Sequence, residues 1–114
     1  DIIQISYRVT EKLYGTILSV DGNGSVTLHF PENVNESTLL IHGSEHFLKT
    51  AYELDNAPEY ERFFFITSTG PVFVDSIINA VKKISKTDST DRASLDIAKN
   101  LRQYSYTLKK RALL

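Results

Sequence analysis

The 114-residue sequence contains no cysteine, so the protein can form neither a disulfide framework nor a thiolate nucleophile. It also has almost no net charge, because 13 lysine and arginine residues oppose 14 aspartate and glutamate residues, for a formal charge of -1. This balance argues against a nucleic-acid binder, whose affinity rests on neutralising phosphates. No apolar run approaches the roughly 20 residues that a membrane-spanning helix needs.

The composition that remains is that of a small globular domain. The chain has a mass of 12.9 kDa, with 41% hydrophobic and 24% charged residues, which suits one modest hydrophobic core. We therefore expect a single domain over residues 1–114. Because Asp1 and Ile2 already belong to a strand pattern, with no initiator methionine before them, we also expect the chain to be a piece of a longer protein.

The most informative stretch of the chain is the aromatic block Phe63, Phe64 and Phe65. Successive side chains of a strand point to opposite faces, so three consecutive phenylalanines place apolar rings on both faces. Neither face can then be left in water without a large cost. The block predicts a central strand, with Phe64 and at least one of its neighbours almost fully buried.

A β-hairpin is predicted where residues 14–20 and 25–30 flank the sequence Asp-Gly-Asn-Gly. Glycine and asparagine tolerate the positive φ angles that tight turns need, which leaves residues 22–24 as a three-residue connection. The register that keeps one face apolar and the other mostly polar pairs Val20 with Val26, Leu18 with Leu28, and Thr16 with Phe30.

Two helices are predicted in the second half of the chain. The first begins at Asp75 or Ser76, which can cap it, and its apolar face consists of Ile77, Ile78, Val81 and Ile84. The second covers about residues 92–101, where alanine, isoleucine and leucine recur at helical spacing. Residues 104–108 alternate again and predict a returning strand, although one helix running to Lys110 is the rival interpretation.

Residues 3–9 also alternate as in a half-buried strand, and residues 39–41 and 47–48 resemble short strands around a turn. Together these patterns predict an α+β fold. We expect an antiparallel sheet folded towards a small sandwich or barrel, with two helices packed on one side.

Two residue sets imitate metal sites. Asp21, Asn23, Ser25 and Glu32 follow the ligand spacing of a calcium-binding loop, but Val26 occupies the position that needs glycine, so a plain hairpin turn is the better interpretation. The three histidines, His29, His42 and His46, form no zinc motif, and we interpret them as surface or hydrogen-bonded side chains. We therefore expect no metal and no cofactor.

The acidic loop before the phenylalanine block is the candidate functional segment. Its residues of interest are Tyr52, Glu53, Asp55, Asn56, Tyr60, Glu61 and Arg62, with Glu59 as a further carboxylate. Two carboxylates held close together could perform acid and base chemistry, as in glycosidases. Alternatively, the loop braces the core through buried acidic hydrogen bonds, which we favour, or presents a surface to a partner.

The blocks YELDNAP (residues 52–58) and ERFFFIT (residues 61–67), together with the hairpin region from residue 14 to residue 31, resemble a bacterial domain of unknown function. That domain occurs in cell-envelope and regulatory proteins, and a similar extracytoplasmic segment follows the membrane helix of anti-sigma-factor-like membrane proteins. The resemblance extends over roughly residues 1–84. It implies a β-rich, non-enzymatic module outside the cytoplasm, and it implies no ligand or active-site residue.

We therefore expect a non-enzymatic binding or sensing module of a bacterial cell-envelope or regulatory protein. Its expected partner is a protein, not a nucleic acid, and the resemblance implies a parent anchored in the membrane. The alternative is a small hydrolase that uses the carboxylates of residues 53–61. A pocket that brings two of these carboxylates together would favour the hydrolase, whereas an open acidic rim would favour the module.

Overall fold

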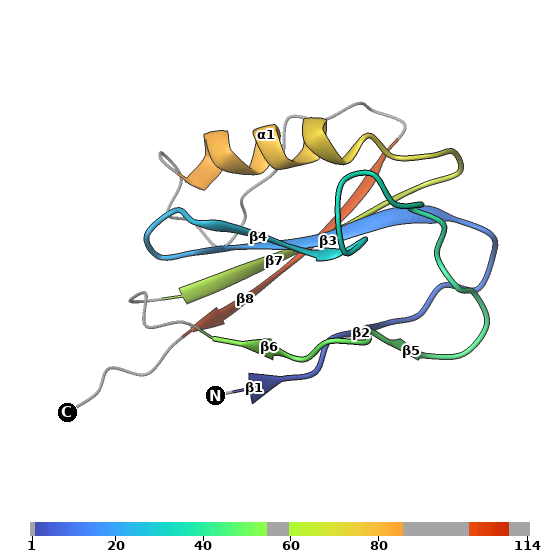
Figure 1. Ribbon diagram of the computed structural model, residues 1–114, viewed down its shortest axis with the longest axis horizontal. Helices are drawn as coiled ribbons and strands as arrows, with labels where there is room; N and C mark the ends of the chain where they lie inside the picture. The colour runs from blue at the N-terminus through green and yellow to red at the C-terminus, as the bar shows by residue number, and fades with distance from the viewer. Residues whose placement is uncertain (1, 55–59, 86–100, 110–114) are drawn as a thin grey trace.

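The chain folds around one antiparallel sheet, which carries a helix on one face and two short strand ribbons on the other (Figure 1). The computed structural model describes residues 2–54, 60–85 and 101–109. Its elements, in chain order, are β1 (Ile2–Ile3), β2 (Ser6–Tyr7), β3 (Tyr14–Asp21), β4 (Val26–Phe30), β5 (His46–Phe47), β6 (Tyr52–Glu53), β7 (Tyr60–Ser68), α1 (Val74–Ser85) and β8 (Arg102–Lys109).

The main sheet has the strand order β4-β3-β7-β8, and each neighbouring pair is antiparallel. The ribbons pair β1 with β6 and β2 with β5. Each ribbon strand has two residues, and the ribbons form sheets separate from the main one. None of the three sheets in the described part of the chain closes into a barrel.

The predicted α+β class with two helices is therefore wrong. The described part of the chain is mostly β and contains one helix, α1. The second predicted helix, over about residues 92–101, falls almost entirely outside the described residues. The returning strand predicted at residues 104–108 is confirmed as part of β8, where tyrosine and threonine alternate in a strand that pairs with β7 along its whole length.

The phenylalanine block forms β7, and the prediction of a central strand is confirmed because β3 and β8 pair with its two edges. Phe64 is 1% exposed and lies opposite Leu18 of β3. Phe63 and Phe65 point to the other face and are only half-buried. The expectation that one of them is also almost fully buried is therefore wrong, because the second face of the sheet is only partly covered.

The face of the main sheet that α1 covers, called here the helix face, holds the larger hydrophobic cluster. Ile77 and Val81 are 2% and 0% exposed, which confirms the predicted apolar face of the helix at these positions. The helix begins at Val74, so the predicted caps lie within its first turn. The side chains of the cluster are Leu18, Val20, Phe64, Ile66, Val72, Ile77, Ala80 and Val81.

The opposite face, called here the groove face, carries Ile17, Ser19, Phe63, Phe65 and Tyr104. Part of it is covered by the N-terminal segment, residues 2–9, and by residues 40–48. A second hydrophobic cluster forms there from Tyr7, Val9, Ile17, Leu40 and Leu48.

Gly15 allows the close approach of β3, β7 and the segment around Leu40. A Cβ atom at position 15 would lie 2.6 Å from the carbonyl oxygen of Ile66 and 3.0 Å from a methyl carbon of Leu40. No real side chain tolerates the first of these distances, because the carbonyl belongs to the paired strand and cannot move aside. The residue at this position must therefore be glycine for β3 to lie this close to β7 and to Leu40.

The hairpin register is confirmed for two of the three predicted pairs, Val20 with Val26 and Leu18 with Leu28. The third is wrong, because an irregularity between Ile17 and Leu18 brings Phe30 opposite Ile17. The Thr16 hydroxyl donates to the carbonyl oxygen of Phe30 at 2.7 Å instead. The three-residue turn is confirmed, and Gly24 supplies its positive φ of 85°.

Phe64→Ala should lower the free energy of unfolding by about 3 to 5 kcal/mol, because it removes a fully buried ring from the helix-face cluster. Tyr106→Ala is the matched control. Since Tyr106 is 66% exposed, its removal should change stability by less than about 1 kcal/mol. Denaturant titration measures both effects, and an unchanged midpoint for a soluble Phe64→Ala variant would contradict the expectation.

Candidate functional site

Strand alternation places four aromatic side chains together on the groove face. Phe63 lies directly opposite Tyr106, and Phe65 lies directly opposite Tyr104, so each pair projects from the same face. The ring centroids of Phe65 and Tyr104 are 6.1 Å apart. Tyr104 and Tyr106 nevertheless remain 54% and 66% exposed. These rings therefore form an aromatic surface that the described part of the chain partly covers at Phe63 and Phe65 but leaves largely exposed at Tyr104 and Tyr106.

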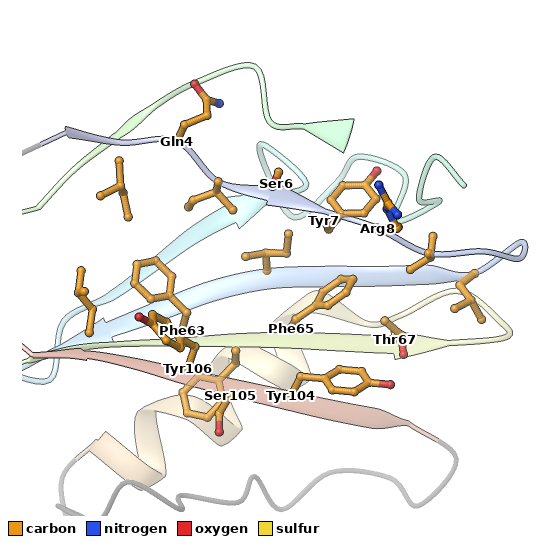
Figure 2. Close-up of a pocket in the computed structure, with 17 residues that line it drawn as sticks. Gln4, Ser6, Tyr7, Arg8, Phe63, Phe65, Thr67, Tyr104, Ser105 and Tyr106 are labelled. Carbon is orange, nitrogen blue, oxygen red and sulfur yellow. The ribbon is translucent and has the colours of Figure 1, made fainter. Parts of the chain in front are cut away.

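The four rings line a groove between the strands β7 and β8 and the N-terminal segment. Figure 2 shows Phe63 and Phe65 pointing from β7 towards that segment, with Tyr104 and Tyr106 on β8. The groove has a volume of about 800 Å³. Its apolar lining, called here the aromatic groove, includes Ile5, Tyr7, Phe63, Phe65, Tyr104 and Tyr106.

One end of the aromatic groove continues into a smaller hollow of about 390 Å³, called here the arginine end. Arg8 and Tyr104 line both spaces, and Arg102 and Glu11 line the hollow. Arg102 lies directly opposite Thr67 in the register of β7 and β8, so its side chain leaves the same face as Tyr104. Both arginines are exposed. The site thus consists of the aromatic groove and, at one end of it, a hollow lined by two arginines.

The residues of the predicted acidic loop separate on folding. Tyr52 turns inward, and its hydroxyl donates a hydrogen bond of 3.2 Å to Oε2 of Glu61, which is 0% exposed. Glu53, the next residue of β6, is exposed. In the described part of the loop, the buried acidic hydrogen bond therefore belongs to Glu61 and not to Glu53.

The remaining predicted loop residues do not join this group. Arg62 follows Glu61 on β7 and points to the opposite face, where it is 1% exposed. Its guanidinium carbon lies 5.0 Å from the ring centroid of Tyr60, the geometry of a cation–π contact. Asp55 and Asn56 lie outside the described residues. Whether the loop as a whole braces the core or binds a partner stays a prediction.

A polar group, called here the His29 cluster, lies under β6 and consists of Ser19, His29, Tyr52 and Glu61. The Ser19 hydroxyl and Nε2 of His29 share a hydrogen bond of 2.8 Å. The rings of His29 and Tyr52 meet edge to face, with centroids 4.5 Å apart. These contacts tie β6 to β3, β4 and β7.

Burial shifts the pKa values of two members of the His29 cluster, His29 and Tyr52. It lowers the pKa of His29 from 6.5 to about 4, so the imidazole is neutral near pH 7. Burial also raises the pKa of the Tyr52 hydroxyl above its ordinary value, which keeps the hydroxyl protonated and able to donate to Glu61. The cluster is therefore a hydrogen-bonded network that holds β6 in place.

Two sets of described residues could suggest catalysis, Ser19 with His29 and Glu53 with Glu61, and neither has the geometry that its chemistry needs. A serine beside a histidine could in principle be a nucleophile with its base, but Ser19 is 0% exposed, so no substrate can reach its hydroxyl. Among the predicted carboxylates, Glu53 is exposed and Glu61 is buried, so these two do not converge on one pocket. These positions give the hydrolase alternative no support.

The two imitations of metal sites have other roles. Oδ1 of Asp21 accepts the backbone N–H groups of Asn23 and Ser25, each at 2.9 Å, as a turn-capping carboxylate does. The ring of His46 packs 5.4 Å from that of Tyr7, and His42 is exposed. Within the described ranges, no group of three potential ligands could hold a metal ion.

The sequence patterns did not reveal the aromatic groove. Its residues showed only the ordinary alternation of half-buried strands, at residues 3–9 and 104–108. The signal that could have indicated it is the match between two alternating aromatic strands, one with Phe63 and Phe65 and one with Tyr104 and Tyr106. That match indicates a shared aromatic surface only once the register of β7 and β8 is known, because the register places the rings opposite one another.

In comparisons by sequence and by structure, no protein-family model, no curated protein and no solved structure matches the chain. The resemblance of residues 52–58 and 61–67 to a bacterial envelope domain therefore stays a prediction.

Lowering the pH from 6.5 to about 4 should reduce the free energy of unfolding, because in this range the unfolded chain binds a proton at His29 that the folded protein does not. The His29 contribution to this loss should be about 1 to 3 kcal/mol, allowing for its incomplete burial. His29→Gln retains a hydrogen-bonding partner for Ser19 but cannot titrate, so its stability should depend less on pH. Denaturant titrations across this range measure the difference, and parallel pH profiles for the two proteins would refute it.

Proposed function

We propose that the protein is a non-enzymatic binding module whose aromatic groove holds an apolar guest. The observation that carries this proposal is the exposure of Tyr104 and Tyr106, 54% and 66%, beside the half-buried rings of Phe63 and Phe65. Contiguous exposed apolar surface beside a hollow is typical of binding sites. The groove volume of about 800 Å³ also lies within the range of small-molecule pockets, about 300 to 1,000 Å³.

The walls of the groove are held in place by hydrogen bonds, which supports the same function. On one side, β8 pairs with β7 along eight residue pairs. On the other side, the carbonyl oxygens of Ile5 and Val9 accept the N–H groups of Leu48 and Gly43 at 2.9 and 2.8 Å. The Tyr7 hydroxyl accepts the N–H of Ile41 at 2.9 Å. A groove built this way loses little conformational entropy when a guest binds.

The cellular setting is proposed from the sequence resemblance alone. Residues 52–58 and 61–67 support a module of a bacterial envelope or regulatory protein, placed outside the cytoplasm, with a protein partner and an anti-sigma-factor-like parent. Among the described residues, no helix has the length and apolar character needed to cross a membrane.

A titration with N-phenyl-1-naphthylamine, a neutral apolar fluorophore that emits more strongly out of water, tests the groove. We expect a saturable rise in emission with one site per chain. Tyr106→Glu places a charge in the groove and should weaken fluorophore binding by about tenfold or more. The bound fluorophore would either bury the carboxylate, which costs free energy, or force it out of the groove.

Phe73→Glu is the matched control, since Phe73 is 81% exposed and does not line the groove, so it should bind the fluorophore as the wild type does. Circular dichroism of both variants establishes that they are folded. Equal affinity in the wild type and Tyr106→Glu, or no saturable signal in the wild type, would overturn the proposed function.

A further inference from the structure

The geometry points to a small anionic amphiphile as the guest, with an apolar body in the aromatic groove and one carboxylate-like head group at the arginine end. This ligand class presupposes the proposed binding function and specifies its chemistry. It follows from the position of Arg8 and Arg102 at one end of a groove whose other lining is mostly apolar.

Strand β8 by itself gives the groove a polar and an apolar end. Arg102, Tyr104, Tyr106 and Leu108 occupy every second position, so their side chains leave the same face of the strand in that order. Read from the start of β8, the groove face therefore presents a cation, then two aromatic rings, then an aliphatic side chain. A guest that matches this order has one charged end and an apolar remainder.

The second cation comes from the opposite wall. Arg8 follows Tyr7, which is 5% exposed and packs against Phe65 with ring centroids 5.9 Å apart. Because Tyr7 is fixed in the second hydrophobic cluster, the backbone at Arg8 is fixed beside the groove. Arg8 lines both the groove and the hollow, as Figure 2 shows for the groove. The hollow thus has an arginine on each of its two walls.

The charges around the site favour an anion over a cation. Among the described residues that line the groove and the hollow, the charged ones are Arg8, Arg102 and Glu11, which leaves an excess of one positive charge. Neither Glu53 nor Glu61 lines either space. Guanidinium groups bind carboxylates through paired, charge-assisted hydrogen bonds, so a carboxylate head group suits the two arginines.

The exposure of both arginines limits the size of this preference. Water and salt screen charges at a surface, so each contact should add modestly to affinity. The apolar body then supplies most of the binding free energy, while the head group fixes its orientation. We expect an effect of about tenfold for the two arginines together and a weakening of that effect at high ionic strength.

Displacement of N-phenyl-1-naphthylamine by three probes of equal chain length tests the head group. The probes are decanoate, decanol and decyltrimethylammonium, and each is titrated into the wild type, the Arg8→Gln/Arg102→Gln double variant and the Lys49→Gln variant. Lys49 is exposed and does not line the groove or the hollow, so its removal controls for a general loss of positive charge.

We expect the double variant to bind decanoate about tenfold more weakly than the wild type, while its affinity for decanol changes by less than about twofold. Lys49→Gln should bind both probes as the wild type does, and the cationic probe should bind the wild type more weakly than decanol. If decanol binds and the double variant loses no selectivity for decanoate, the head-group assignment is wrong while the proposed function stands. If no probe binds the wild type, the proposed function itself is wrong and the ligand class fails with it.

Discussion

The rest of the structure depends on one constraint, the presence of apolar rings on both faces of β7. Phe64 points to one face, and Phe63 and Phe65 point to the other, so the sheet needs a covering layer on each side. Helix α1 is the covering layer on the helix face, where Phe64 is 1% exposed. The ribbons and the N-terminal segment form the layer on the groove face (Figure 1). They cover only part of it, because Tyr104 and Tyr106 stay exposed.

The uneven second layer divides the groove face into three regions of different character. Beneath β6, the hydrogen-bonded polar side chains around His29 replace hydrophobic packing. Beneath residues 40–48, the aliphatic and aromatic side chains of the second cluster are buried. Over β7 and β8, the aromatic rings stay in contact with water. Exposed apolar area disfavours the folded protein relative to a fully covered sheet, by about 25 cal/mol for each Å² left in water. A guest that covers these rings would regain that free energy.

Local patterns in the sequence predicted the parts of the fold that local physics determines. The run of phenylalanines identified the central strand, and the glycines around Asn23 identified the hairpin. The apolar face shared by the two hairpin strands identified most of their register. The apolar spacing of Ile77 and Val81 identified the buried face of α1.

The features that were missed depend on contacts between distant segments. The alternation of residues 3–9 predicted a strand, but it did not indicate the division into β1 and β2 or their pairing with β6 and β5. The shift that pairs Phe30 with Ile17 leaves no recognisable pattern in the sequence of either strand. The groove forms only where β7, β8 and the N-terminal segment come together. The aromatic residues of β7 and β8 are visible in the sequence, but the sequence does not indicate that they lie opposite one another. Among the site residues, the loop with Tyr52 and Glu61 was identified, but the sequence could not indicate that Glu53 faces water.

The pairing of β7 with β8 also determines when, during synthesis and folding, the main sheet can be completed. This pairing joins Tyr60 to Lys109 and Thr67 to Arg102, contacts that are widely separated along the chain, whereas β3 and β4 are joined by a short turn. Closing a long loop costs more conformational entropy than closing a short one and slows the step that requires it. During synthesis, the hairpin can form as soon as its two strands have emerged, but one wall of the groove is missing until β8 has been made. The aromatic groove is thus among the last parts of the described fold to form.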